Sequence, residues 1–166
     1  MKNMKVKTKK TITSILIFSW MILVFYFSHQ ASGKSSELSE GVTRAILNFF
    51  KLLNDKTLKD QLLIQLFIRK LAHYLIYTLG GIIIFLHVNL YKVKLKEKVF
   101  ISWIAGTVYA ITDEIHQLFI PGRSGEIRDV SIDSLGTISG IIICLIVLKI
   151  LQKKDINNSK EKCLGK

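Results

Sequence analysis

The stretch YAITDEIHQLFIPGRSGEIRDV, residues 109–130, begins as an apolar helix and ends as a hydrophilic turn. Asp113 and Glu114 stand side by side where the two halves meet. Pro121 and Gly122 follow them, and these two residue types favour a tight turn. We therefore predict that the apolar helices before and after the turn are antiparallel neighbours, joined at the end that carries the acids.

Apolar residues elsewhere in the chain are also gathered into long blocks. No Asp, Glu, Lys or Arg occurs in residues 11–33, 71–91 and 99–112, and Asp133 is the only such residue in 130–148. A helix needs about 20 mostly apolar residues to cross a membrane, and Pro121 is the only proline that would interrupt one. The chain is predicted to be all-α, a four-helix transmembrane bundle with spans at residues 11–28, 71–91, 99–119 and 130–149. Residues 1–152 would form this domain and residues 153–166 a polar tail.

Basic residues are distributed unevenly around these blocks, in a chain with a formal net charge of +12. Lysines precede the first span, separate the second from the third and follow the fourth: Lys2, Lys5, Lys7, Lys9, Lys10, Lys92, Lys94, Lys96, Lys98, Lys149, Lys153, Lys154, Lys160, Lys162 and Lys166. Loops rich in lysine and arginine face the cytoplasm, so both termini are predicted to be cytoplasmic. Topology and anionic inner-leaflet lipid account for the charge, and no nucleic-acid partner is predicted.

The basic N-terminus followed by an apolar block also has the pattern of a secretory signal peptide. Its apolar part is long for such a peptide, and SHQAS, residues 28–32, is a poor cleavage site, so we predict a retained anchor. Cys144 and Cys163 form neither a disulfide framework nor a paired set of metal ligands. No cofactor is predicted.

A segment at residues 34–70 is predicted to lie at the outer face between the first two spans. Its apolar residues recur at helical spacing, at Val42, Ala45, Ile46, Phe49, Phe50 and Leu53. This pattern predicts an amphipathic helix in the interface plane, either as a spacer or as a lid. Thr57 with Asp60 three residues later signals a further helix that runs into the second span.

Polar side chains are predicted at the same, extracytoplasmic end of all four spans. Asp113, His116 and Gln117 share one helical face, with Glu114 about 100° round from Asp113. An ionised carboxylate that faces lipid costs at least a few kcal/mol. The acids must therefore point into the bundle, into water, or toward cations.

The same spacing of four residues recurs on the other spans. It pairs His73 with Tyr77 and Asp129 with Asp133, and the cations available to the acids are Lys70, Arg123 and Arg128. One interpretation is a structural clamp, a network of ion pairs that fastens the outer ends of the helices. The other is a polar pocket that opens to the outer leaflet, which the number of polar groups favours. Gly136 with Gly140 and Gly106 with Ala110 are assigned to helix packing alone.

Three chemistries are possible in such a pocket. A metal site built from His73, Asp113, Glu114 and Asp133 is disfavoured because no close-spaced ligand motif is present, so no metal is predicted. General acid–base catalysis by Asp113 and Glu114, with His73 as a shuttle, would need one carboxyl pKa to be raised by the other. Ser28 has no well-placed base beside it and is interpreted as an ordinary helix-end serine.

Three stretches together carry a resemblance to a known family: FSHQ at 27–30, RKLAHYLIYTLG at 69–80 and DEIHQLFIPGRSGEIRDVSIDSLG at 113–136. They resemble the VanZ-like family of small bacterial membrane proteins, and the third stretch is the most specific. The resemblance implies a bacterial plasma-membrane protein with functional positions at Ser28, Gln30, Lys70, His73, Tyr77, Asp113, Glu114, Gln117, Arg123, Asp129 and Gly136. Asp133 occupies a position where family members frequently have an asparagine. His29 and His116 are not among the family's motif positions, and no functional role is assigned to them.

The name of that family comes from a protein associated with low-level resistance to teicoplanin, a glycopeptide with an acyl chain. The resemblance implies a pocket that binds or processes an anionic lipid-linked cell-wall precursor or a lipoglycopeptide, with membrane lipids as partners. The expected catalytic residues are Asp113, Glu114, His73 and Asp129. The expected substrate-binding residues are Arg123, Arg128, Lys70, Gln117, Tyr77, Ser28, Gln30 and Asp133. A hydrolase or transferase acting on polyprenyl-linked precursors and a proton-coupled carrier are the alternatives.

Overall fold

The computed structural model describes residues 2–30, 37, 40–45, 58–123 and 125–163, and within these it contains helices and turns but no strand. The four long helices are α1 (Lys2–Ser28), α3 (Leu58–Val88), α4 (Leu95–Gln117) and α5 (Ile127–Cys163). Residues 40–45 form a shorter helical stretch. The prediction of an all-α chain is therefore confirmed for this part of the sequence.

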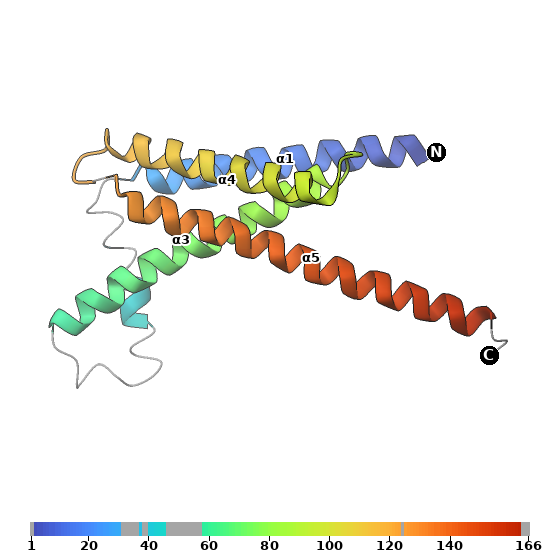
Figure 1. Cartoon of the computed structure of the whole chain (residues 1–166). Helices are drawn as coiled ribbons and strands as arrows, with labels where there is room; N and C mark the ends of the chain where they lie inside the picture. Colours follow the sequence, from blue (N-terminus) through green and yellow to red (C-terminus); the bar gives the residue numbers. More distant parts are fainter. Residues whose placement is uncertain (1, 31–36, 38–39, 46–57, 124, 164–166) are drawn as a thin grey trace.

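The long helices run alternately in opposite directions (Figure 1). Both termini lie at one end of the molecule, together with the connection from α3 to α4, and the turn from α4 to α5 lies at the other end. This arrangement confirms that the helices on either side of Pro121 and Gly122 are antiparallel neighbours. It also brings the ends of α1, α4 and α5 together beside the first half of α3.

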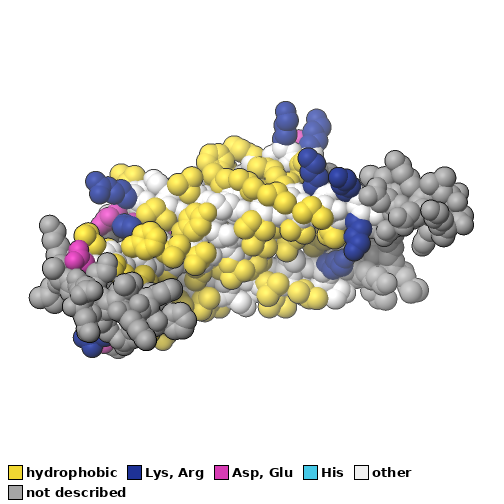
Figure 2. Space-filling model, turned by 90° about the horizontal axis from the view of Figure 1, so that it is seen from below, with side chains coloured by type: hydrophobic (Ala, Val, Ile, Leu, Met, Phe, Trp, Pro, Cys, Tyr) yellow, Lys and Arg dark blue, Asp and Glu magenta, His cyan; other side chains and the backbone are white. Residues whose placement is uncertain are grey.

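Within the described residues, three helices contain segments long and apolar enough to cross a membrane, at Val6–Ser28, Leu62–Val88 and Ile127–Lys154. Each covers much of a predicted span, although the second begins before residue 71 because α3 continues through Arg69 and Lys70. Helix α4 is not among these segments, because Asp113, Glu114 and other polar residues shorten its apolar length. The span predicted at 99–119 thus stays a prediction. Figure 2 shows hydrophobic side chains across the middle of the molecule, with Lys and Arg toward its two ends.

The connection between α1 and α3 is described only in part. Residues 40–45 are helical, as predicted, and contain Val42 and Ala45. The remaining apolar residues of the proposed amphipathic face, Ile46, Phe49, Phe50 and Leu53, lie outside the described residues, as does Thr57. The helix predicted to run from this point into the second span is confirmed, since α3 begins at Leu58 and has Asp60 in its first turn.

Helix α3 packs most extensively against α5, and glycines make this close approach possible. A Cβ atom built at Gly136 would lie 2.5 Å from the carbonyl oxygen of Tyr74. One built at Gly140 would lie 2.1 Å from the carbonyl oxygen of Thr78. Both distances are far below van der Waals contact, so the small residues let the two backbones touch. The packing role predicted for these glycines is confirmed.

Helix α1 is attached to the others through aromatic side chains. Trp20 is buried, packs edge-on against Tyr77 of α3, and donates a hydrogen bond of 2.8 Å from its indole nitrogen to the carbonyl oxygen of Ile76. The Tyr109 hydroxyl of α4 donates one of 2.6 Å to the carbonyl oxygen of Met21. Tyrosine and tryptophan can be buried at little cost when their polar atoms find such partners. These contacts fix the second half of α1 beside the polar residues of α3 and α4.

Candidate functional site

The turn between α4 and α5 sets the position of Arg123. Gly122 has a φ of 75°, and the Arg123 amide donates a hydrogen bond of 3.1 Å to the carbonyl oxygen of Ile120. Proline followed by glycine at positive φ is the preferred sequence of a type II turn. The turn points Arg123 back toward α1, where its guanidinium group donates a hydrogen bond of 3.2 Å to the carbonyl oxygen of Phe27.

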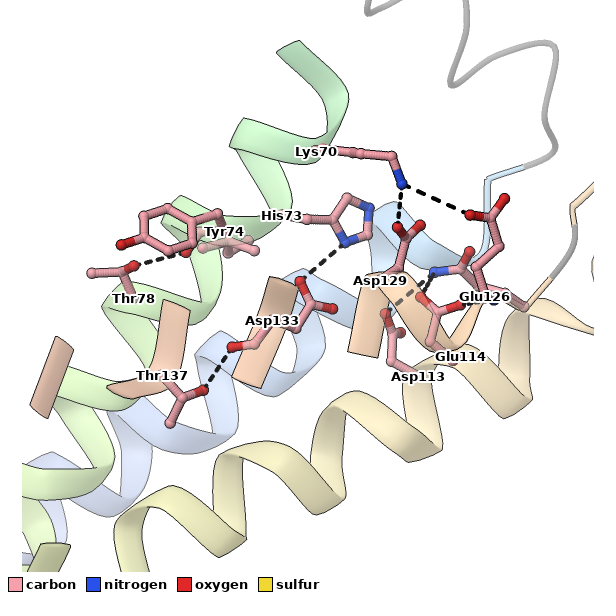
Figure 3. Close-up of polar contacts among 12 residues, drawn as sticks. Lys70, His73, Tyr74, Thr78, Asp113, Glu114, Glu126, Asp129, Asp133 and Thr137 are labelled. Atoms are coloured by element: carbon pink, nitrogen blue, oxygen red, sulfur yellow. Dashed lines mark hydrogen bonds and ion pairs between the residues drawn. The ribbon is translucent and has the colours of Figure 1, made fainter. Parts of the chain in front are cut away.

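An ion-pair cluster, made of Lys70, Glu126 and Asp129, joins α3 to the start of α5 (Figure 3). The Lys70 ammonium nitrogen lies 2.5 Å from a carboxylate oxygen of Asp129 and 3.8 Å from one of Glu126. Lys70 is 39 % exposed at its side chain, so water screens the cluster and limits its contribution to stability. The contacts of Lys70 and Asp129 match the clamp interpretation.

Glu114 also makes contacts that hold the turn in place. One of its carboxylate oxygens accepts a hydrogen bond of 2.9 Å from the backbone amide of Glu126, directly before α5. Gln117 lies between the two neighbouring acids and donates from its side-chain nitrogen to both Asp113 and Glu114, at 3.4 Å each. These are long hydrogen bonds and therefore weak ones. Glu114 and Gln117 are buried, and they orient the end of α4 against the start of α5.

Deeper in the bundle, a second cluster contains His73, Asp113 and Asp133, one residue from each of α3, α4 and α5. The Nδ1 atom of His73 lies 3.6 Å from Oδ1 of Asp133, which is completely buried. Neither Asp133 oxygen has a hydrogen-bond partner among the described residues. One nitrogen or oxygen atom from each of His73, Asp113 and Asp133 lies within 4.8 Å of the others. We call these three residues the His73 cluster.

A cavity of about 310 Å³ lies against the His73 cluster. Its walls come from α1, α3, the end of α4, the turn and residue 42, and its lining residues are Val24, Phe27, Ser28, Gln30, Val42, Ile68, Arg69, Ala72, His73, Ile76, Asp113 and Arg123. Half of these residues are apolar, and two carry guanidinium groups. A volume of a few hundred Å³ that combines apolar walls with polar groups able to orient a ligand is typical of a ligand pocket.

Arg123 brings a positive charge to this cavity that the surrounding protein only partly compensates. Its Nε atom is buried without a hydrogen-bond partner among the described residues. Burial lowers the pKa of the Arg123 guanidinium, the nearby Arg69 lowers it further, and Asp113 and Glu114 oppose this change. The group stays cationic, since an arginine guanidinium is protonated at any physiological pH. An anion placed between the two arginines would therefore be stabilised.

The predicted site residues divide between these regions. Ser28 and Gln30 line the cavity with His73, Asp113 and Arg123, whereas Lys70, Glu114, Gln117 and Asp129 hold the helix ends together. Asp133 lies behind His73. Tyr77 is completely buried against Trp20 and does not line the cavity. Arg128 is exposed and lies outside the lining.

His116, which lies outside the family positions, makes its contacts away from Asp113 and Gln117. Its Nε2 atom lies 3.3 Å from Nδ1 of His29, and both imidazole rings stack near Phe25 of α1. The reason is that α1 lies beside this side of α4 and offers aromatic contacts there. The two histidines thus form a separate surface pair.

Arg69 is the cavity residue that the sequence prediction missed. Arg69, Ala72, His73 and Ile76 are spaced at i, i+3, i+4 and i+7, which places them on one helical face. All four line the cavity, so the spacing around His73 contained the signal that identifies Arg69.

The comparison with protein families gives one match. A family model described as VanZ/LLP1 matches residues 13–148, which is most of the chain and includes the cavity, the ion-pair cluster and the His73 cluster. No curated protein and no solved structure matched the chain.

Proposed function

The chain belongs to the VanZ/LLP1 family, and on that premise we propose that it is a membrane protein that binds an anionic lipid-linked ligand in the cavity between α1 and α3. The observation that carries this proposal is the pairing of Arg69 and Arg123 with apolar walls in one cavity. Guanidinium groups present forked donors that suit phosphate and carboxylate oxygens. The apolar walls suit the first part of a hydrocarbon chain.

The proposed location is the outer half of a bacterial plasma membrane. The lysine-rich segments lie at the end of the molecule that contains both termini, and cytoplasmic loops are the ones rich in lysine. In this orientation α4 is the third of four spans, with Asp113 and Glu114 at its extracytoplasmic end. The cavity then opens where lipid-linked cell-wall precursors and lipoglycopeptides are found, and low-level resistance to teicoplanin-type glycopeptides follows if such a ligand is sequestered or processed.

The proposal is tested by measuring ligand binding to the full chain in nanodiscs, with a polyprenyl phosphate as the probe and a zwitterionic lipid as the comparison. Loss of a charge-assisted hydrogen bond costs about 1.5–3 kcal/mol, or roughly a ten- to hundredfold change in Kd. We expect Arg123→Ala to weaken binding of the polyprenyl phosphate by that factor. Arg128→Ala is the matched control and should leave Kd unchanged.

The same pair of variants tests the link to resistance in cells. Arg123→Ala should abolish protection against a lipidated glycopeptide at unchanged membrane abundance, while Arg128→Ala should retain it. If protection disappears only together with the protein, the arginine has a structural role and the polar residues are a clamp. Equal binding of the anionic and the zwitterionic lipid would contradict the proposed ligand class.

A second candidate function is a membrane-embedded hydrolase or transferase acting on polyprenyl-linked precursors. The observation that favours it is the position of His73, which lines the cavity with Asp133 behind its imidazole at 3.6 Å. A carboxylate in this position orients a histidine that acts as a general base. Incubation of the purified chain with a polyprenyl pyrophosphate, with and without divalent metal, decides between binding and turnover.

A proton-coupled carrier is less well supported. Between His73 and His87 on α3, and between Asp133 and Lys149 on α5, the sequence contains no ionisable residue except Tyr74, Tyr77 and Cys144. A carrier that relays protons needs a chain of titratable groups through the membrane.

A further inference from the structure

We propose that the His73 cluster is a binding site for a divalent cation, with a nitrogen of His73 and carboxylate oxygens of Asp113 and Asp133 as its ligands. The cation site does not depend on the proposed lipid ligand. A bound cation could also hold the anionic head group of a lipid, and this second role rests on the proposed function.

The first argument is the condition of Asp133. Its side chain has no exposed surface, and both carboxylate oxygens lack a hydrogen-bond partner among the described residues. Buried polar atoms in native proteins are nearly always satisfied. Nδ1 of His73 is also buried and has no hydrogen-bond partner in the described part of the chain. It faces Oδ1 of Asp133 at 3.6 Å, beyond hydrogen-bond distance, so the two side chains do not satisfy each other and a further ligand could complete their contacts.

The second argument is charge. Asp113 and Asp133 are both buried, and His73 is the one basic side chain within ion-pair distance of Asp133 among the described residues. Lys70 is bound to Asp129, and the hydrogen bond of Arg123 goes to the Phe27 carbonyl. Two ionised carboxylates in a protein interior carry a large desolvation cost. A divalent cation would neutralise them completely and leave His73 in its neutral, ligating form.

The third argument is geometry and ligand chemistry. The three ligand atoms lie within 4.8 Å of one another. Ligands at about 2.1 Å from one metal lie about 3.0–3.4 Å apart in octahedral or tetrahedral geometry, so side-chain movements of about 1 Å would close the site. One imidazole and two carboxylates suit Mn²⁺, Fe²⁺ or Zn²⁺. Because His73 and Asp113 also line the cavity, the open coordination positions would face it.

The test measures Mn²⁺ binding to the full chain, purified in detergent with a tag that contains no histidine. We expect one tightly bound Mn²⁺ per chain, detected by metal analysis and electron paramagnetic resonance. Loss of a residue that merely supports a metal ligand costs about 10- to 100-fold in affinity. Asp133→Asn, which removes a ligand charge at constant shape, should therefore weaken Mn²⁺ binding by at least about tenfold.

Two control variants separate this site from other sources of metal binding. Asp129→Asn changes the neighbouring acid of α5 that pairs with Lys70, and it should retain the Mn²⁺ affinity. His116→Ala removes half of the exposed histidine pair, and it too should retain one Mn²⁺ per chain. If His116→Ala rather than Asp133→Asn removes the metal, the proposal is overturned.

Thermal unfolding distinguishes the loss of a metal ligand from a folding defect in Asp133→Asn. Mn²⁺ should raise the Tm of the wild-type chain, because a ligand that binds only the folded state stabilises it, and it should not raise the Tm of Asp133→Asn. Without metal the variant should unfold at the same temperature as the wild type or a higher one, since a buried charge has been removed. Binding of the polyprenyl phosphate without saturable Mn²⁺ binding would reject the cation site alone. Saturable Mn²⁺ binding without binding of the polyprenyl phosphate would reject only the proposed lipid ligand.

Discussion

At the scale of single residues, the acids of this protein have different tasks although they lie close together. Glu114 is bound to the backbone amide of Glu126, and Asp129 is bound to Lys70. Asp113 and Asp133 instead face His73. The first pair holds the junction of α4 and α5, while the second pair belongs to the proposed cation site. A count of acids in the sequence does not separate these roles, because the separation depends on which backbone and side-chain partners the turn brings within reach.

The role of Glu114 gives a prediction about stability. Glu114→Ala would break the hydrogen bond from the Glu126 amide, and a hydrogen bond of this kind contributes about 0.5–1.5 kcal/mol. Glu114→Gln keeps an acceptor oxygen and loses only the favourable charge at the N-terminus of α5, which contributes about 0.3–1 kcal/mol. Thermal unfolding in detergent should therefore rank the wild type above the glutamine variant and the alanine variant lowest. Equal Tm values for both variants would show that the hydrogen bond contributes nothing.

The neighbouring cations Arg69 and Lys70 give a prediction about binding. Arg69 lines the cavity, whereas Lys70 is held by Asp129 and Glu126. We expect Arg69→Ala to weaken binding of a polyprenyl phosphate by roughly tenfold, the equivalent of about 1.4 kcal/mol. Lys70→Ala should lower Tm slightly and leave Kd nearly unchanged. The opposite ranking would mean that the ligand contacts the ion-pair cluster instead of the cavity.

At the scale of whole elements, the crossing of α3 and α5 depends on glycine. A methyl group at Gly140 would lie 2.1 Å from the Thr78 carbonyl oxygen and 2.9 Å from the Ile82 nitrogen, and these backbone atoms cannot rotate away. Overpacking of this kind costs about 1–3 kcal/mol. Gly140→Ala should lower Tm accordingly and, by moving Asp133 relative to His73, weaken Mn²⁺ binding as well.

Gly41 provides the control for this substitution. It lies in the helical stretch 40–45 and has nothing within 4 Å of an added Cβ atom. Gly41→Ala should be neutral or slightly stabilising, because alanine loses less backbone freedom than glycine in a helix. A Gly140→Ala variant as stable as Gly41→Ala would mean that the two helices do not cross at this point.

The helices themselves could be predicted from the sequence because their signals are local. Apolar blocks, the Pro121–Gly122 turn and the small residues at positions 136 and 140 each act over a few residues, and the structure confirms the antiparallel turn and the glycine packing. The polar contacts depend on which helices are neighbours in space. Helical spacing puts His116 on the same face as Asp113, but its side chain contacts His29 at the end of α1 instead. No local pattern in the sequence predicts this contact.

At the scale of the whole molecule, the ends of the bundle differ in chemistry. The end with both termini contains most of the lysines in the sequence, and the end with the α4–α5 turn contains the ion-pair cluster and the cavity. This difference predicts the orientation in the membrane, since lysine-rich loops are retained on the cytoplasmic side. The orientation decides whether the cavity meets extracellular ligands, so the proposed function depends on it.

The orientation can be measured by cysteine labelling in cells, in a background where Cys144 is replaced by alanine and Cys163 by serine. Single cysteines are introduced by Arg128→Cys, beside the turn, and by Lys94→Cys, in the connection between α3 and α4, and both positions are exposed. A membrane-impermeant maleimide added to intact cells should modify the cysteine at position 128. The cysteine at position 94 should react only after the membrane is permeabilised, because the lysines around it keep this connection in the cytoplasm. The reverse pattern would place the cavity at the cytoplasmic face, where neither a glycopeptide nor an exported wall precursor could reach Arg123.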